Sequence, residues 1–349
     1  MSAIGLLATL CAAAGVFSIT NSSNIGNLDV LAGIFANGSI VNGQIVIEGM
    51  AGDPVTPHYS LAASLSPMAP ADPYIDKQWA LDRINAAELW RVDSEVIVAI
   101  LDTGIDKDHE DLRGVVVAEM NFVDSTTPSD INGHGTHIAG IIAANSNNDR
   151  GIAGLAPGAC LINLKVADDT GLCRSKDVAR GIIRAVDMGA KVINISLEIV
   201  EPSEDVARAV EYAWGKGALV VAAAGNNGSD TPVYPAGYEH TLAVAALTME
   251  DCLAPLSNYG EWVDVAAPGM NIFSLLPDDN YGYKTGTSFA AAHVSGVAAV
   301  LFSVAKDVNG NGHVNDEVRD AIEDSCDIIG TDKMGNLRLD AARALAAIN

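Results

Sequence analysis

The chain has 349 residues, of which 44 are acidic and 20 basic, and its formal net charge at pH 7 is −24. Hydrophobic residues make up 49% and charged residues 18%, which excludes a disordered polyanion and indicates a large globular domain with an appendage. Nucleic acid is not an expected partner, because no basic stripe is present to displace counterions from phosphates. Five cysteines without a C-x-x-C pair argue against a zinc ribbon or a disulfide-dense scaffold.

The first 70 residues differ from the rest in composition. Residues 3–19 form an uncharged apolar run whose length fits a signal-peptide core or a short membrane anchor, although no positive charge precedes it. Residues 20–66 are rich in Asn, Gly and Ser, and Ser39–Ile47 predicts a hairpin around Asn42-Gly43. A linker with five prolines follows, at positions 54, 57, 67, 70 and 73. We expect a signal peptide or anchor at 1–20, an accessory or divergent pro-segment at 21–70, and the functional domain at 71–349.

From about residue 72 onward, apolar runs alternate with helical patterns. Glu95–Leu101 is nearly continuous in apolar residues, as expected for a strand covered on both faces. Similar runs follow at residues 161–166, 191–197, 218–224, 241–247 and 262–267. Ser175 is expected to cap a helix reaching about residue 188, and Ser203 a second helix reaching about residue 216. The alternation predicts a mostly parallel sheet with helices on both faces and a functional site at the carboxyl ends of its strands.

Three short segments carry residues typical of a nucleophilic hydrolase. The first expected strand ends in Leu101-Asp102-Thr-Gly, the segment Asn132–Gly140 contains His134, and Ser288 opens the most apolar helix. A serine nucleophile needs a histidine that takes its proton and a carboxylate that fixes the tautomer of that histidine. Asn226 follows another buried strand, where its amide could donate to a developing oxyanion.

In this order the segments resemble the Asp, His and Ser boxes of the subtilisin-like serine peptidases (subtilases, peptidase S8), with thermitase-like features. The resemblance covers about Asp72 to the C-terminus. It implies an α/β fold with three αβα layers and a mostly parallel central sheet, and a serine endopeptidase that hydrolyses protein substrates through an acyl-enzyme. By position, Ser288 corresponds to the nucleophile, His134 to the general base and acid, Asp102 to the orienting carboxylate and Asn226 to the oxyanion donor.

Other candidate residues have simpler interpretations. His137 and His293 are expected to pack or cap within helices, and His109 to be a loop residue. Asp106 is a rival to Asp102, but it lies beyond the Thr-Gly turn and is expected to face solvent. A serine esterase would need Gly-x-Ser-x-Gly, whereas residues 286–290 are Gly-Thr-Ser-Phe-Ala. The alternative from another class is a binding protein on an inactive protease scaffold, which the presence of all four catalytic residue types disfavours.

The resemblance further implies a cleft that holds an extended peptide as an added strand. Its edges correspond to Ser196, Leu197 and Glu198 on one side and Gly171, Leu172 and Cys173 on the other, with Ala223, Ala224 and Gly225 as the wall of the P1 pocket. Glu198 stands where the family usually has glycine, so its carboxylate would narrow the pocket, favour a basic P1 residue or turn outward. We expect a broad, neutral-to-hydrophobic P1 preference. Phe289 follows the nucleophile where many relatives have an oxidisable methionine.

Calcium is the cofactor that the resemblance implies. Side chains of Asp72, Asp111 and Asn148 and carbonyl oxygens of Asn145, Arg150 and Ile152 correspond to the strong calcium site of the family, and such hard oxygen donors suit Ca²⁺. The segment Asp307–Glu317 starts like an EF-hand loop but has Val318 at the twelfth position, which leaves calcium binding there open.

The expected partners are protein or peptide substrates. We expect a monomer that is secreted or extracellular, or associated with a membrane through the N-terminal apolar run. A zymogen cleaved near residues 66–71 is the expected precursor.

Overall fold

The computed structural model describes residues 70–329 and 337–348, together with the backbone of four short strands between residues 8 and 47. The chain divides into two units, residues 1–65 and 66–349. In the first unit, β1 (Ala8–Cys11) pairs antiparallel with β2 (Val16–Ile19), and β3 (Gly38–Val41) with β4 (Gln44–Ile47). The β3–β4 pair confirms the predicted hairpin. The described parts of the apolar run 3–19 are therefore strands, and the proline-punctuated linker lies almost entirely outside the described residues.

The second unit contains a nine-stranded sheet with the order β14-β15-β11-β10-β9-β8-β5-β7-β6. All neighbouring pairs are parallel except β14–β15. The strands are β5 (Ile97–Asp102), β6 (Val116–Asn121), β7 (Cys160–Lys165), β8 (Val192–Ile195), β9 (Leu219–Ala223), β10 (Thr241–Leu247), β11 (Val265–Pro268), β14 (Asp327–Ile328) and β15 (Leu337–Arg338). A separate antiparallel hairpin consists of β12 (Ile272–Leu276) and β13 (Asn280–Lys284). Every strand predicted from an apolar run is present.

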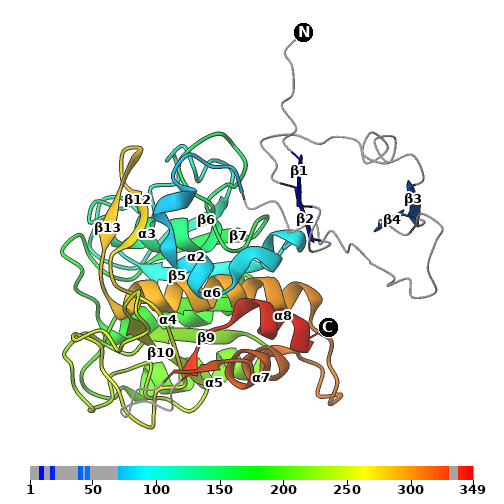
Figure 1. The fold of residues 1–349 in the computed structure, drawn as a ribbon. Helices are drawn as coiled ribbons and strands as arrows, with labels where there is room; N and C mark the ends of the chain where they lie inside the picture. Colours follow the sequence, from blue (N-terminus) through cyan, green and yellow to red (C-terminus); the bar gives the residue numbers. More distant parts are fainter. Residues whose placement is uncertain are drawn as a thin grey trace. The chain divides into compact units, whose positions relative to one another are not determined.

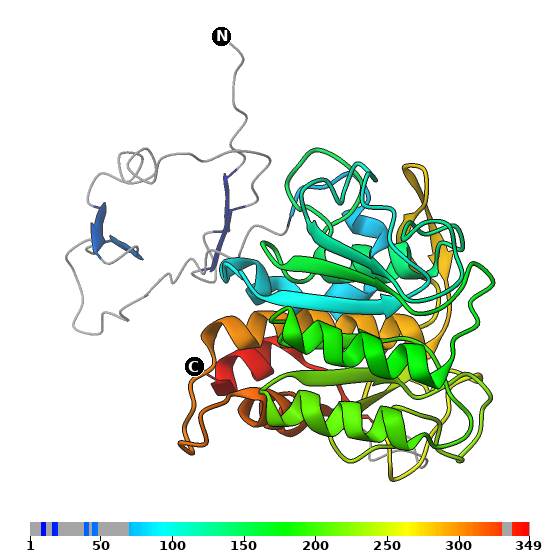
Figure 2. The ribbon, with the colours of Figure 1, turned by 180° about the vertical axis from the view of Figure 1, so that it is seen from behind.

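Helices cover both faces of this sheet, which confirms the three-layer α/β fold (Figures 1 and 2). One face carries α3 (His134–Ala143), α6 (Thr287–Val304) and α8 (Ala341–Ile348), and the other carries α4 (Ser175–Asp187) and α5 (Glu204–Gly215), which run side by side in Figure 2. Shorter helices are η1 (Ile75–Lys77), α2 (Trp79–Arg83), η2 (Ala86–Arg91) and α7 (Asn315–Asp324).

Apolar side chains on both faces of the strands explain the continuous apolar runs in the sequence. Val98 and Ile100 of β5 belong to the core beneath α3 and α6, whereas Ala99 and Leu101 belong to the core beneath α4 and α5. In the described part of the chain, α6 is the helix long and apolar enough to cross a membrane, but 83% of that stretch is buried inside the domain. Its hydrophobicity therefore reflects its position in the core.

The two predicted helix caps differ in detail from the structure. Ser175 is the first residue of α4, and the N-cap position is occupied by Arg174. Ser203 does occupy the N-cap of α5, but its side chain makes no capping hydrogen bond. Acidic residues in the first turns of both helices provide the favourable interaction with the helix dipole instead.

Candidate active site

Neighbouring parallel strands bring the predicted catalytic residues to one edge of the sheet. Asp102 is the last residue of β5, Ser196 follows β8, and Asn226 follows β9, with β8 lying between β5 and β9. His134 is the first residue of α3, and Ser288 is the second residue of α6. Because both helices pack on the same face of the sheet, their N-terminal ends present these side chains to the end of β5.

The imidazole of His134 is oriented by a buried carboxylate. His134 Nδ1 donates to Asp102 Oδ1 at 2.7 Å, and the same oxygen accepts the backbone N–H of Thr103 at 2.7 Å. Burial acts to lower the pKa of His134, but the charge and hydrogen bond of Asp102 outweigh it and leave that pKa above its usual value. The hydrogen bond holds the neutral tautomer with its proton on Nδ1, so that Nε2 is the basic nitrogen.

Close packing of His134 against the strand end requires a glycine. A Cβ atom on Gly135 would lie 2.0 Å from the carbonyl oxygen of Gly104 and 3.1 Å from Asp102 Cβ. Any larger residue at 135 would push the start of α3 away from β5. The glycines in both sequence boxes therefore allow the Asp102–His134 contact to form.

Ser288 lies at the N-terminus of α6 and is 5% exposed. Its Oγ donates to the carbonyl oxygen of Ser196 at 3.3 Å, and Ser196 Oγ donates to the carbonyl oxygen of Ser288 at 3.0 Å. The ring of Phe289 lies 5.5 Å from that of His134, measured between centroids, so the imidazole is adjacent to the first turn of α6. In enzymes without substrate, the serine–histidine hydrogen bond is often long and tightens when substrate binds.

Asn226 is fixed by its amide oxygen. Thr287 donates to Asn226 Oδ1 twice, from its backbone N–H at 2.9 Å and from its hydroxyl at 3.1 Å. The same hydroxyl accepts the backbone N–H of Gly225 at 3.1 Å. With the oxygen of its side chain accepting from Thr287, Asn226 retains the N–H groups of Nδ2 as donors for a developing oxyanion.

Asp130 is a site residue that the sequence interpretation missed. It is 4% exposed and accepts the N–H groups of Gly133 and Thr136 at 2.8 Å each, the hydroxyl of Thr136 at 2.7 Å and that of Thr103 at 2.8 Å. Its carboxylate therefore caps the helix that begins at His134, and its charge contributes to the raised pKa of His134. An acidic residue a few positions before the start of a helix is the sequence signal that could have revealed this capping role.

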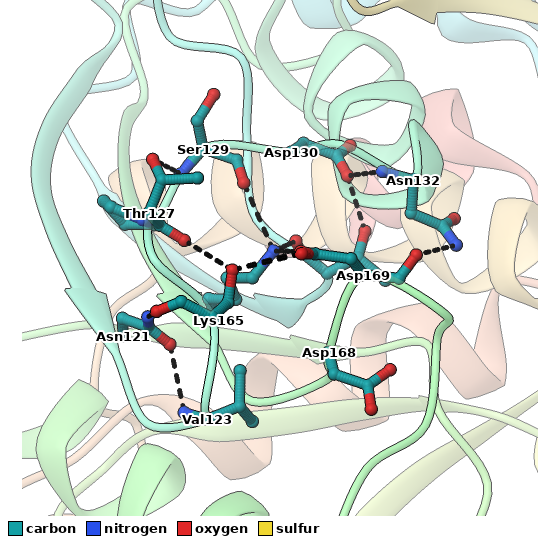
Figure 3. A network of polar contacts seen from close by, with 12 residues as sticks. Asn121, Val123, Thr127, Ser129, Asp130, Asn132, Lys165, Asp168 and Asp169 are labelled. Atoms are coloured by element: carbon teal, nitrogen blue, oxygen red, sulfur yellow. Dashed lines mark hydrogen bonds and ion pairs between the residues drawn. The ribbon is translucent and has the colours of Figure 1, made fainter.

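Lys165 is a second missed residue, and it is fully buried at the end of β7, opposite Asp102 in the strand register. Its Nζ donates to the carbonyl oxygens of Thr103 and Ser129 and forms an ion pair with Asp169 at 2.7 Å (Figure 3). One ammonium group thus connects the turn after Asp102 with two neighbouring loops. No sequence signal indicates this role, because lysine is almost always exposed unless it is paired.

Comparison with known proteins identifies the family. Residues 93–341 match the sequence model of the Subtilase family (peptidase S8). The chain belongs to this family. A thermophilic serine proteinase from Bacillus sp. (strain AK1) is 40% identical over 302 residues, 82% of this chain and 72% of that protein. Thermitase from Thermoactinomyces vulgaris is 44% identical over 264 residues, 74% of this chain and 92% of its own.

A solved protease structure from Pseudoalteromonas arctica PAMC 21717 has a TM-score of 0.73 and 29% identity, and the alignment covers 80% of this chain and 99% of that one. The similarity therefore extends from sequence to the whole three-layer domain. Family membership makes this subtilase a serine endopeptidase that acts on protein substrates.

The two predicted edges of the substrate cleft lie on either side of Asp102. Ser196, Leu197 and Glu198 follow β8, Gly171, Leu172 and Cys173 follow β7, and β5 lies between β7 and β8 in the sheet. Leu172 is 72% exposed and Cys173 is partly buried, while the predicted pocket wall at Ala223 and Ala224 is buried. Cys160, Cys173, Cys252 and Cys326 are all free thiols.

The three other histidines considered in the sequence have structural surroundings, as predicted. His137 is fully buried against the ring of Phe289, and His293 Nδ1 donates to the carbonyl oxygen of Phe289 within α6 at 2.7 Å. Burial lowers the pKa of both side chains, that of His293 to about 4. His109 lies in a turn and bonds the carbonyl of Asn280. Asp106 accepts the backbone N–H of Asp108 in its own turn and that of Asp278 between β12 and β13, so it bonds protein groups as well as facing solvent.

Two of the residues predicted to bind calcium, Asp72 and Asp111, are buried carboxylates that bond the loop 145–152. Asp72 accepts the N–H groups of Asn147 and Asn148 at 2.8 and 3.1 Å, and Asp111 accepts the side-chain amide of Asn148 at 2.9 Å and the N–H of Ile152 at 3.0 Å. Burial raises the pKa of Asp72, and the negative charge of Asp111 raises it further. Two adjacent buried carboxylates offer the hard anionic oxygens that a divalent cation prefers, although they accept N–H groups here and Asn148 directs its amide nitrogen toward Asp111.

Within the described residues, no site is formed by three or more His, Cys, Asp or Glu side chains. The set around Asp72 and Asp111 has only two such side chains, and its other donors would be amide and backbone oxygens. In the Asp307–Glu317 loop, Asp307 accepts the N–H groups of Gly310 and Gly312, while the amides of Asn309 and Asn311 donate to Asp316. The acidic side chains of that loop therefore bond groups of the loop itself.

Proposed function

We propose that this subtilase cleaves peptide bonds through an acyl-enzyme on Ser288, with His134 as general base and acid, Asp102 as orienting carboxylate and Asn226 as oxyanion donor. The observation that carries the proposal is the 2.7 Å hydrogen bond between His134 Nδ1 and Asp102 Oδ1, formed beside the residue that follows Ser288. This arrangement leaves Nε2 free to take a proton, which is the chemical requirement for activating a serine hydroxyl.

The reaction would proceed in two steps, acylation of Ser288 and hydrolysis of the acyl-enzyme. His134 Nε2 takes the proton of Ser288 Oγ while Oγ attacks the scissile carbonyl carbon, and the resulting oxyanion is bound by Asn226 Nδ2 and backbone N–H groups at the start of α6. The C–N bond then breaks as the imidazolium returns its proton to the leaving amine. Water repeats the sequence, giving the carboxylic acid product and free Ser288. Asp102 remains ionised throughout and stabilises the imidazolium.

An extended peptide would be held between Ser196-Leu197-Glu198 and Gly171-Leu172-Cys173, with Ala223-Ala224-Gly225 as the wall of the P1 pocket. The position of these two edges on opposite sides of the end of β5 supports this assignment. Calcium would be held by the side chains of Asp72, Asp111 and Asn148 and carbonyls of Asn145, Arg150 and Ile152. Bound there, it would neutralise the two buried carboxylates and stabilise the loop 145–152.

Secretion and maturation also belong to the proposal. The apolar run 3–19 and the proline-rich linker before residue 73 support an exported precursor that loses its N-terminal region near residues 66–71. N-terminal sequencing of purified, active protein tests this, because an intact Met1 on active enzyme would contradict cleavage. A monomeric state and association with a membrane are two further predictions, and both can be tested on the same purified protein.

Labelling by a fluorophosphonate tests the catalytic assignment directly. In calcium-containing buffer, the native chain should form one adduct, which peptide mass spectrometry locates on Ser288. Ser288→Ala should abolish the adduct, and His134→Ala should slow its formation by orders of magnitude because the hydroxyl loses its base. The binding-protein alternative predicts no adduct on the correctly folded chain, and that result would reject the proposed mechanism.

A further inference from the structure

Glu198 points toward the segment that contains the proposed oxyanion donor. Its Oε1 accepts the side-chain N–H of Asn227 at 3.1 Å, and its Oε2 lies 3.0 Å from the position that a Cβ on Gly225 would occupy. Gly225 and Asn227 flank Asn226 on both sides. The carboxylate is therefore directed across the residues after β9, and the outward orientation that the sequence left open is not the one adopted.

The orientation of Glu198 is supported by a buried amide. Asn258 is fully buried, and its Oδ1 accepts the backbone N–H groups of Asn227 and Ser229 at 3.0 Å each. This fixes the backbone that carries the hydrogen-bond donor to Glu198. The side-chain position thus depends on an ordered set of contacts between the segments after β8 and β9.

The charge of Glu198 has no counter-charge in the described parts of the chain. Its hydrogen-bond partner is the neutral amide of Asn227, it forms no ion pair there, and it is exposed. Cys173 lies on the opposite predicted edge of the cleft. Its pKa is raised to about 11, first by burial and then by the negative charges of Asp102 and Glu198. Glu198 therefore places an unpaired negative charge beside the predicted cleft.

The geometry of the acyl-enzyme places a substrate side chain in the same region. With its carbonyl carbon on Ser288 Oγ and its oxygen at Asn226, the P1 residue would lie beside two segments: 196–198, in which Ser196 accepts from Ser288 Oγ, and 225–227, in which Asn226 accepts from Thr287. Glu198 joins these two segments. A P1 side chain that extends between them ends near the carboxylate, and only Lys and Arg combine enough length with a positive charge to pair with it.

We propose that Glu198 is a specificity-determining residue that makes this subtilase prefer Lys or Arg at P1. The inference rests on the proposed catalytic function, and it replaces the neutral-to-hydrophobic preference expected from the sequence. The net charge of −24 acts in the same direction, because it attracts cationic segments of substrates to the enzyme surface. Charge-assisted hydrogen bonds between a cationic P1 side chain and this carboxylate correspond to a preference on the order of tenfold.

The test compares kcat/KM for one peptide sequence with Lys, Arg, Met, Phe or Ala at P1, with active enzyme counted by fluorophosphonate titration. Native enzyme should prefer Lys and Arg over Met by about tenfold. Glu198→Gln keeps the size of the side chain and removes its charge, so it should lower the ratio of kcat/KM for the Lys and Arg peptides over the Met peptide to about one. Glu201→Gln removes an exposed charge three residues away and should leave the preference intact.

Each alternative gives a different result. If the side chain only narrows the pocket, Ala is preferred at P1 and Glu198→Gln behaves like native enzyme, which overturns the inference. If Glu201→Gln reduces the preference as much as Glu198→Gln does, net charge rather than position is responsible, and the inference also fails. A folded chain that neither labels nor hydrolyses any of the peptides instead overturns the catalytic assignment, whereas labelled, active enzyme without a basic preference overturns only the role of Glu198.

Discussion

Replacing Lys165 with methionine should destabilise the domain more than any substitution at an exposed charge. The variant keeps the length and approximate volume of the side chain, so no large cavity forms. What is lost is the ammonium group, which is 0% exposed and donates to the carbonyl oxygens of Thr103 and Ser129 and to Asp169. The effect therefore reports the polar contacts of Lys165 and not its packing.

The magnitude follows from the burial of each acceptor. Thr103 is 1% exposed, and a buried carbonyl left without its donor costs about 1–3 kcal/mol. Ser129 is half-buried and regains part of its hydration, so it contributes at the lower end of that range. The side chain of Asp169 is 38% exposed, which limits the loss of its ion pair to less than about 1 kcal/mol. Together these give a decrease of about 2–5 kcal/mol in the free energy of unfolding.

Urea unfolding in calcium buffer measures this decrease, and a Ser288→Ala background prevents autolysis during the experiment. Asp169→Asn, which keeps the buried ammonium bonded to both carbonyls, should cost less than about 1 kcal/mol. Lys176→Met removes an exposed lysine of α4 and serves as a matched control. A Lys165→Met variant within 1 kcal/mol of its parent, or no more affected than Asp169→Asn, would refute the assigned role of the buried ammonium.

Four further outcomes follow from the site. Asn226→Ala should lower kcat by about 10²–10³, the family magnitude for an oxyanion donor, with little change in KM, and an unchanged kcat excludes it from that role. Because the pKa of His134 is raised above its usual value, kcat/KM should fall as pH decreases through that pKa and the base becomes protonated; a profile flat down to pH 5 contradicts this. Native enzyme should retain activity in roughly millimolar peroxide, whereas Phe289→Met should lose it, and equal sensitivity would show that position 289 is irrelevant. Chelation of calcium should lower the melting temperature of the native protein. The decrease should be much smaller in Asp111→Asn, because this variant has only one of the two buried carboxylates that would bind the ion. Equal decreases in both proteins would show that calcium binds elsewhere.

Strands buried on both faces could be predicted from the sequence, whereas strands at the edge of the sheet or outside it could not. β10 coincides with the predicted run 241–247, since every one of its residues is buried. β6 is the edge strand of the sheet, and Val117 within it is 55% exposed, so it gives no continuous apolar signal. The β12–β13 hairpin was missed for a related reason, because the residues of β13 are largely outside the core.

The residues proposed for catalysis could be selected from the sequence because their local motifs are short, and each lies at the end of a recognisable element. Asp130 and Lys165 have no such motif. Their roles arise from contacts between segments distant in sequence, such as that of Lys165 with Thr103, 62 positions away. The orientation of the Glu198 side chain could not be predicted either, because it depends on contacts with Asn227 and Asn258, which follow other strands.

These contacts converge on Thr103, the residue after the proposed orienting carboxylate. Its N–H donates to Asp102, its hydroxyl donates to Asp130 and accepts the N–H of Gly135, and its carbonyl accepts from Lys165. All three polar groups of one buried residue are thus committed to charged groups or to the start of α3. Two buried carboxylates near His134 would repel each other and raise the cost of burial, and the nearby ammonium of Lys165 offsets that cost. The same acids favour the imidazolium that forms when Ser288 is deprotonated, so the turn that stabilises the fold also stabilises the charged intermediate of the proposed reaction.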